Sequence, residues 1–174
     1  MVAISNSMIA VVGLNGALQK RFVMETSLVP GNVHRATRID IGVGGKGQDV
    51  AIALSCLSRP CKLLQFIGQG PEGDQVYEML QQTVGQDALE STTIRTVAPL
   101  RTCTSIVGAD CTTELVEPSG SIQKEDLDEI YNACAKQNVD AICIMGSMPP
   151  GCPDDTYARI YQAIEASSNT KKNK

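Results

Sequence analysis

The stretch IGVGGKGQDVAIALSCL, from Ile41 to Leu57, determines how the rest of the chain is interpreted. It places four glycines and Lys46 within six residues, directly before a segment with the apolar spacing of a helix. Glycine permits positive φ and lets a second molecule approach bare backbone amides. Because a helix directs its unpaired N–H groups and the positive end of its dipole toward its start, the stretch predicts a seat for a phosphate or a hydroxyl-rich ligand. A plain strand-to-helix turn is the competing interpretation, although it needs fewer glycines.

Two nucleotide-binding motifs are similar to this stretch. A P-loop requires Ser or Thr directly after Gly-Lys, whereas Gly47 follows Lys46 here. Gly42, Gly44 and Gly47 do satisfy the G-x-G-x-x-G dinucleotide fingerprint. That fingerprint also requires an acidic residue at the end of the next strand, about 20 residues on, and the next apolar run, KLLQFIGQG, ends without one. A dinucleotide-dependent oxidoreductase therefore stays open as the third-ranked hypothesis.

Composition and charge are those of an ordinary soluble globular protein. The chain has 174 residues, of which 43% are hydrophobic and 20% charged, enough for one domain with a core. A net charge of −4, no basic block and an aromatic content of 3% argue against nucleic acid as a partner. No run approaches the ~18 consecutive apolar residues of a membrane span, and the first residues lack the basic start of a signal peptide. We therefore expect a cytoplasmic protein that does not bind membranes.

The seven cysteines and the single histidine predict neither disulfides nor a metal site. Seven is an odd number, no pair forms C-x-x-C, and several cysteines lie in apolar runs, which indicates reduced thiols. His34 has no neighbour at a metal-ligand spacing. No metal-ligating residue is therefore predicted.

Alternating apolar runs and amphipathic segments predict an α/β fold. Residues 8–14 form a continuous apolar run, which is typical of a buried parallel strand. Two more polar strands, 21–29 and 33–41, are predicted to pair around a turn at 30–32. The other early elements are a helix that buries Val50, Ala51, Leu54 and Leu57, a strand at 63–67 and a helix at 72–83.

The second half of the chain continues this pattern. Three Thr- and Val-rich strands between 91 and 117 are predicted to join the early hairpin in one small antiparallel sheet, with a turn at 108–110. Ser121 is the predicted N-cap of a helix at 124–137. A buried strand at 140–145, a helix from Asp154 or Asp155 to about Ala166, and a frayed tail at 167–174 complete the prediction. The whole pattern predicts a doubly wound sheet with a small inserted β-sheet.

Six short motifs, in chain order, resemble those of the ribokinase-like (phosphofructokinase-B) carbohydrate kinases: NGAL, PGNVHRA, GGKG, FIGQGPEGD, TTELVEP and MGSMPPG. TTELVEP and SMPPG are most similar to the branch that phosphorylates fructose 1-phosphate or tagatose 6-phosphate. The resemblance implies a Rossmann-type doubly wound sheet with an antiparallel β lid, formed by strands at about 20–41 and 91–117. It also implies that residues 1–174 are the N-terminal part of one sugar-kinase domain.

The resemblance assigns a substrate site to this chain. Lys46 and Arg101 stand where that branch holds the substrate's own phosphate, with a point charge and a bidentate fork on one dianion. Gly44 and Gly45 would let the backbone and the following helix approach the sugar. A phosphate-bearing sugar is therefore the expected ligand.

Two further site positions depart from the family pattern. Gln19 stands where the family has an Asp, and Asp49 stands where it has an Asn. The resemblance implies that both would face the sugar hydroxyls. Either the site keeps one carboxylate and one amide with their places exchanged, or sugar binding is lost. The sequence leaves both alternatives open.

The family's ATP site and its catalytic Gly-Ala-Gly-Asp run lie in a C-terminal half that has no counterpart in this sequence. ATP and Mg²⁺ are therefore implied only for the family, and no catalytic residue is predicted in this chain. Because phosphoryl transfer depends on positioning and electrostatic stabilisation, we expect the chain by itself to be inactive.

The leading hypothesis is ATP-dependent phosphorylation of a sugar or sugar phosphate, with this chain supplying the substrate site and the lid. The alternative is a non-catalytic module that binds a sugar phosphate or a partner protein. In both cases the lid sheet is a candidate surface for a homodimer.

Overall fold

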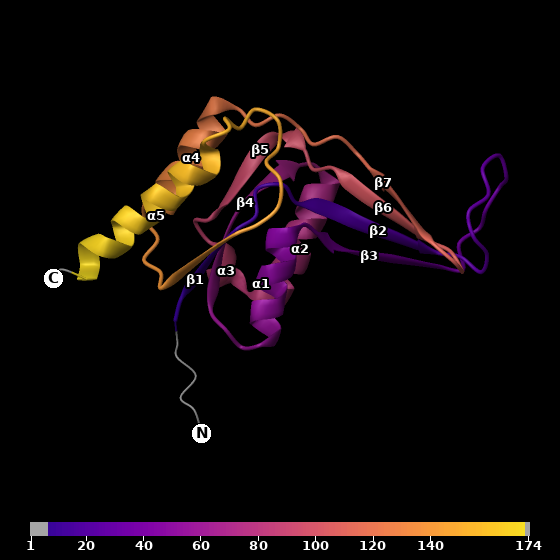
Figure 1. Ribbon diagram of the computed structural model, residues 1–174, viewed down its shortest axis with the longest axis horizontal. Coiled ribbons are helices and arrows are strands. Elements are labelled where there is room, and N and C mark those ends of the chain that lie inside the picture. The colour runs from indigo at the N-terminus through magenta and orange to yellow at the C-terminus, as the bar shows by residue number, and fades with distance from the viewer. Residues whose placement is uncertain (1–6, 173–174) are drawn as a thin grey trace, which may run out of the picture.

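The computed structural model describes residues 7–172, with side chains through Ser168. Helices cover a core sheet, and a lid sheet projects from the core to one side (Figure 1). The core sheet has the strand order β5-β4-β1-β8, and all of its pairs are parallel. Its strands are β1 Ile9–Val12, β4 Cys61–Gln69, β5 Thr93–Pro99 and β8 Ala141–Ile144.

The helices lie on both faces of the core sheet, which confirms the predicted doubly wound α/β fold. One face carries α1 (Lys46–Cys56), α2 (Pro71–Val84) and α3 (Gln86–Leu89), and the other carries α4 (Lys124–Cys134) and α5 (Thr156–Lys172). Consecutive residues of β1 belong to the two opposite clusters, Val11 to the first and Val12 to the second. A strand buried on both faces needs an unbroken apolar run, and this explains the sequence of β1.

The lid sheet has the order β3-β2-β6-β7 and contains one parallel pair. Its strands are β2 Ala17–Val23, β3 Arg38–Gly44, β6 Thr102–Val107 and β7 Thr112–Val116. β2 pairs antiparallel with β3, and β6 with β7, but β2 and β6 are parallel. The lid is therefore a mixed sheet rather than the antiparallel one predicted. Both β2 and β6 leave the carboxyl end of a core strand, and the core strands β1 and β5 run in the same direction.

β5 belongs to the core sheet, so the prediction that every strand between 91 and 117 joins the lid is wrong for its first strand. β5 pairs in parallel with β4, and its Ile94 and Thr96 are buried. The alternation of Thr with Val and Ile predicts a strand but does not specify its sheet. A strand that follows another strand through a helix returns to the same sheet as a parallel neighbour, and α2 and α3 form that crossover.

Several predicted boundaries also shift. β2 and β3 are joined by residues 24–37, and the predicted turn lies inside that loop, where Asn32 N donates to Val29 O at 3.3 Å. The hairpin turn between β6 and β7 is confirmed. Ser121 does not cap α4, because the helix begins one residue after Gln123, whose N–H donates to Asp126 Oδ2 at 2.9 Å.

The predicted frayed tail is helical over most of its length. α5 continues to Lys172, past the predicted end near Ala166, and the last two residues of the tail lie outside the described residues. Ile160 and Ile164 anchor the first turns of α5 in the core, and its later turns extend that anchored segment without a helix-breaking residue.

Candidate functional site

The chain passes between core and lid at four places, and these crossings meet at the carboxyl ends of the core strands. β1 leads into β2 through Asn15 and Gly16, and β3 leads into α1 through Gly45. β5 leads into β6 through Arg101, and β7 leads back to α4. In open α/β sheets, ligands bind outside the carboxyl ends of the strands. The junction of lid and core is therefore the candidate site.

The start of α1 faces this junction with unpaired N–H groups. Gly45, at φ 126°, is the N-cap residue, and because it has no side chain the N–H groups of the first turn receive no side-chain cap. The first intrahelical bond runs from Asp49 N to Gly45 O at 2.8 Å. Lys46 is exposed and makes no hydrogen bond or ion pair within the described residues. A Cβ built on Gly146, after β8, would lie 3.7 Å from Lys46 Cβ.

Asp49 is exposed in the first turn of α1, on the helix that carries Lys46. Neighbouring atoms remove part of its water, and this desolvation raises the pKa of the Asp49 carboxyl above its usual range. The structure thus places the Asp49 carboxylate at the edge of the candidate site.

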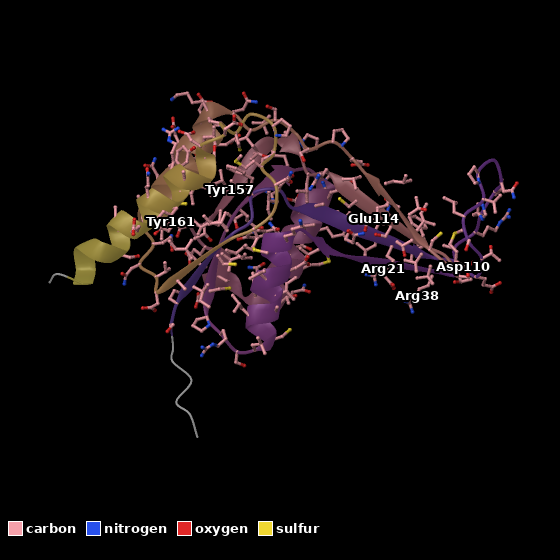
Figure 2. All side chains as sticks on the ribbon, viewed as in Figure 1. Arg21, Arg38, Asp110, Glu114, Tyr157 and Tyr161 are labelled. Carbon is pink, nitrogen blue, oxygen red and sulfur yellow. The ribbon has the colours of Figure 1, made fainter. Side chains whose placement is uncertain are left out.

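Gln19 lies in β2 on the polar face of the lid sheet and is held by neighbouring strands. Its Nε2 donates to Ser105 Oγ at 2.9 Å, and Ser105 Oγ donates to Glu114 Oε1 at 3.3 Å. A Cβ on Gly44 would lie 3.3 Å from Gln19 Oε1, so this oxygen is directed toward the end of β3. Arg21 projects from the lid sheet in Figure 2 and continues the polar side chains of this face.

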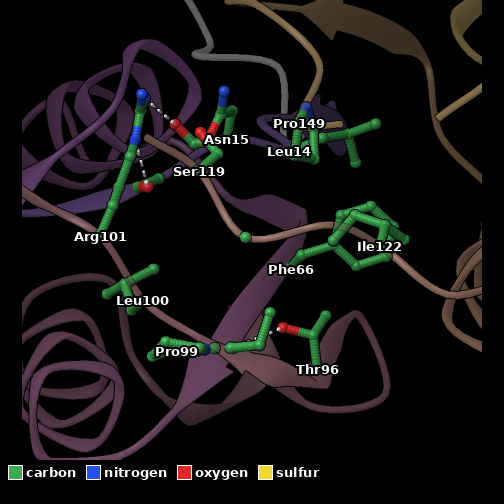
Figure 3. Close-up of a pocket in the computed structure, with 14 residues that line it drawn as sticks. Leu14, Asn15, Phe66, Thr96, Pro99, Leu100, Arg101, Ser119, Ile122 and Pro149 are labelled. Atoms are coloured by element: carbon green, nitrogen blue, oxygen red, sulfur yellow. Dashed lines mark hydrogen bonds between the residues drawn. The ribbon is translucent and has the colours of Figure 1, made fainter. Parts of the chain in front are cut away.

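Arg101 binds the turn that follows β1 (Figure 3). Its Nη2 donates to Asn15 O at 3.1 Å and its Nε lies 3.4 Å from Gly16 O. Asn15 in turn accepts from Ser119 Oγ at 2.7 Å and donates to Ser147 Oγ at 3.1 Å. Three loops at the junction are thereby joined through one asparagine.

The cavity beside Arg101 is too small for a sugar phosphate. It holds about 30 Å³, and its lining combines the apolar Leu14, Phe66, Leu100 and Ile122 with the polar Asn15, Thr96, Arg101 and Ser119 (Figure 3). That volume accommodates roughly one water molecule. A ligand would therefore bind on the open side of the junction, next to the start of α1.

Most of the predicted site residues lie along one continuous path. Arg101 contacts Gly16, a Cβ on Gly45 would lie 3.1 Å from Gly16 Cα, and Lys46 follows Gly45. Gly44 pairs with Ala17, two residues before Gln19. Gly42 and Gly44 are thus part of the lid strand β3 rather than of a core strand, so the glycines do not have the strand–turn–helix context of a dinucleotide fingerprint.

Sequence reasoning missed Gln48, which is only 1% exposed. Its Nε2 donates to Gly13 O at 2.8 Å and to Gln65 Oε1 at 2.9 Å, and Gln65 Nε2 donates to Thr93 Oγ1 at 3.1 Å. The predicted buried face of α1 is in part wrong, because Gly47, Gln48 and Ala51 are buried while Leu57 is 69% exposed. Counting three residues back from Ala51 would have placed Gln48 on the buried face.

The Gln48 amide is only half satisfied. Its Oε1 is buried and has no hydrogen-bond partner among the described residues. Each hydrogen bond from Nε2 contributes about 0.5–1.5 kcal/mol, and burying an acceptor without a donor costs about 1–3 kcal/mol. The two contributions offset each other, so stability alone does not account for this amide.

Tyr157 was also missed, and it holds the Gly146–Ser147 turn. Its hydroxyl lies within 3.1–3.4 Å of the carbonyl oxygens of Met145, Gly146 and Ser147. Burial, followed by the neighbouring Cys152, raises the pKa of the Tyr157 phenol, so the hydroxyl remains a donor. α5 thereby fixes the turn beside Lys46.

Within residues 7–172, no group of three His, Cys, Asp or Glu side chains is placed to hold a metal ion. No helix in the described part of the chain is long and apolar enough to cross a membrane.

A helix-covered parallel sheet, with a β lid over the carboxyl ends of its strands and a Gly-Lys helix start at the junction, defines a carbohydrate-kinase type of fold. The family model of the pfkB family carbohydrate kinases matches residues 7–173, and the chain belongs to this family.

Relatives agree with this assignment. The 1-phosphofructokinase of Haloferax volcanii is 29% identical over 156 residues, which cover 90% of this chain and 50% of that protein. A protein described as a possible 1-phosphofructokinase from Thermotoga maritima superposes with a TM-score of 0.79 at 23% identity, over 92% of this chain and 51% of that one. Phosphofructokinase-2 from Escherichia coli, in complex with fructose-6-phosphate, superposes with a TM-score of 0.80 at 19% identity, over 93% and 52%. The chain thus spans about half the length of the relatives it matches.

Proposed function

We propose that this chain carries the sugar-phosphate site and the lid of an ATP-dependent carbohydrate kinase of the 1-phosphofructokinase or tagatose-6-phosphate kinase branch. The observation that supports this most is the start of α1, where uncapped N–H groups and the unpaired Lys46 adjoin the turn bound by Arg101. Helix N-termini of this kind bind phosphates. Residues 1–174 would correspond to the N-terminal part of one kinase domain, in line with their half-length match to relatives.

In this proposal Lys46 and Arg101 hold the phosphate already present on the substrate. Arg101 uses Nε and one Nη on backbone carbonyls, and a guanidinium has five N–H donors, so it retains donors for a phosphate oxygen. Lys46 supplies a point charge, and no carboxylate of the described residues forms an ion pair with it. Gly44 and Gly45 would leave room for the sugar beside the first turn of α1.

The exchange of carboxylate and amide would set the sugar preference. Gln19 is held by Ser105, whereas Asp49 is exposed, so the carboxylate is the group that can adapt to a hydroxyl. The Gln19→Asp, Asp49→Asn double variant restores the family pattern and should change the ranking of sugar phosphates in thermal-shift assays. No shift of the parent protein with any member of the panel would mean that sugar binding is lost.

ATP and Mg²⁺ are proposed to bind outside the described residues, where the family's catalytic Asp also belongs. Kinases of this family use ATP, but the described residues offer no metal-holding cluster. The core sheet ends at β8, whose second edge is unpaired in the described chain and is the side on which a further parallel strand would add. The chain alone is therefore expected to bind substrate without transferring phosphate.

Isothermal titration of the full chain with fructose 1-phosphate and tagatose 6-phosphate tests the proposal. We expect saturable binding of at least one of them, with fructose and inorganic phosphate binding more weakly. Lys46→Met should weaken affinity about ten- to hundredfold, because a hydrogen bond to a charged group is worth about 1.5–3 kcal/mol. Lys136→Met removes an exposed lysine next to α4 and should change nothing. Equal binding by the Lys46 variant and the parent would refute the phosphate seat.

A second proposal is that the chain forms a homodimer through the apolar face of the lid sheet, which is the face opposite Gln19. We also propose that the protein is located in the cytoplasm. Ile39 and Leu115 are 53% and 57% exposed. Both line one hollow of the lid sheet together with Phe22 and Ile106, and apolar side chains gathered on one face mark an interaction surface. All seven cysteines are free thiols, which suits a reducing compartment. Sedimentation equilibrium should give a dimer, and Leu115→Glu should give a monomer. A monomeric parent at about 100 μM would exclude the dimer, because obligate dimers bind more tightly than this.

A further inference from the structure

Gln48 connects the first turn of α1 to the core sheet. Its Nε2 binds the carbonyl of Gly13, at the end of β1, and Gln65 in β4, which in turn binds Thr93 in β5. The neighbours of Gln48 along the helix, Gly47 and Ala51, are also buried, whereas Lys46 and Asp49 are exposed. One buried amide therefore fixes the start of the helix that presents the exposed site residues.

The same amide packs against the loop that Arg101 binds. A Cβ on Gly16 would lie 3.0 Å from Gln48 Nε2, and a Cβ on Gly13 would lie 3.2 Å from Gln48 Oε1. A Cβ on Gly45 would collide with Gln48 Oε1. Three glycines from two different crossings thus surround one side chain, and each leaves space that the amide occupies.

Stabilisation of the fold does not by itself explain Gln48, because one oxygen of its amide has no hydrogen-bond partner among the described residues. Gln48 Oε1 is buried without a donor among the described residues, although Nε2 on the same group is fully engaged. An apolar side chain of the same length would avoid this unsatisfied acceptor. What it would lose is the directional tie between α1 and the loop after β1.

We propose that Gln48 is a positioning residue that sets the separation of Lys46 and Arg101. Lys46 stands two residues before it in the same helical turn, and Arg101 is bound to Gly16 and Asn15, in the loop that contacts the Gln48 amide. Both phosphate-binding groups are therefore placed relative to one amide. This inference rests on the proposed sugar-phosphate site.

Three variants of the full chain test the inference. Gln48→Met keeps the volume and removes both hydrogen bonds, and the Gln48→Met, Gln65→Met double variant also removes the partner that would be left unpaired. Gln137→Met is the matched control, because Gln137 is a buried glutamine that bonds a backbone carbonyl within the α4 region. Each is compared with the parent by urea unfolding, by titration with fructose 1-phosphate, and by hydrogen exchange of the Asp49 amide, which bonds to Gly45 O.

Gln48→Met is expected to weaken fructose 1-phosphate binding about five- to tenfold and to speed exchange of the Asp49 amide about tenfold, as expected for coupled neighbouring groups. The double variant should have a higher urea midpoint than Gln48→Met, while its fructose 1-phosphate affinity stays weaker, and its Asp49 amide exchange faster, than in the parent. Gln137→Met should lower the midpoint without either local effect. The positioning role would be overturned if, in all three variants, the loss of fructose 1-phosphate affinity and the faster exchange of the Asp49 amide simply paralleled the fall in the urea midpoint.

The two proposals fail in different ways. If the parent binds neither fructose 1-phosphate nor tagatose 6-phosphate, the proposed function fails, and hydrogen exchange of the Asp49 amide alone then decides the role of Gln48. Faster exchange in both Gln48 variants but not in Gln137→Met supports positioning, and unchanged exchange overturns it.

Discussion

Gly13→Ala should destabilise the protein by forcing α1 away from β1. A Cβ at this position would lie 2.7 Å from Gly47 Cα, where ordinary contacts begin at 3.4 Å, so the helix must move by about 0.7 Å or more. Gly13 is held in place because its N–H donates to Leu64 O at 3.0 Å and its carbonyl accepts from Gln48 Nε2 at 2.8 Å. Overpacking of this kind costs about 1–3 kcal/mol, and weakening one hydrogen bond adds about 1 kcal/mol.

Urea unfolding followed by circular dichroism measures this effect. With a urea dependence of about 2 kcal/mol per molar, a loss of about 2–4 kcal/mol lowers the midpoint by roughly 1–2 M. Gly42→Ala is the matched control, because a Cβ there meets no atom within 4 Å, and its midpoint should not fall. The close packing of α1 on β1 is refuted if Gly13→Ala unfolds at the midpoint of the parent.

Three further perturbations follow from the same structure. Burial raises the pKa of the Asp49 carboxyl in the folded state, so its ionised form opposes folding at neutral pH. Asp49→Asn should therefore raise the urea midpoint at pH 7, and a pH series should show this difference shrinking as the pH falls and vanishing below the ordinary Asp pKa of 3.8. Burial raises the pKa of Cys134 to about 12, so at pH 8 iodoacetamide should label the exposed Cys56 and Cys111 first and Cys134 last, and equal labelling by mass spectrometry would contradict this order. Tyr157→Phe removes the donor shared by three carbonyls and should cost about 1–2 kcal/mol in urea unfolding, whereas an unchanged midpoint would mean that these carbonyls do not need it.

The core strands were predictable because burial on both faces leaves a direct trace in the sequence. The run from Ile9 to Val12 has no polar residue, and the structure buries Ala10, Val11 and Val12 completely. The lid was predictable only as a set of strands. Thr93 to Pro99 has the same alternation as the lid strands, and only the preceding helical crossover places β5 in the core.

Site positions near the glycine stretch were predictable as residues but not as contacts. Lys46 and Asp49 are exposed at the start of α1, as expected for groups that meet a ligand, although whether they bind one stays a prediction. Helical spacing could have predicted the burial of Gln48 but not its partners, because Gly13 and Gln65 lie 35 and 17 residues away in the chain. Tertiary contacts of buried polar groups carry no local periodicity, so pattern reasoning does not find them.

The parallel pairing of β2 with β6 has a consequence for how the molecule assembles. It joins residue 18 to residue 102, and the chain between them contains, besides the β2–β3 hairpin, the core elements α1, β4, α2, α3 and β5. Closing so long a loop costs chain entropy that is recovered only once the intervening helices and strands have compacted. We therefore expect the complete lid, with β2 paired to β6, to be the last part of the chain to form and the first to open. It behaves as a dependent folding unit whose local stability can be low while the core below it stays intact.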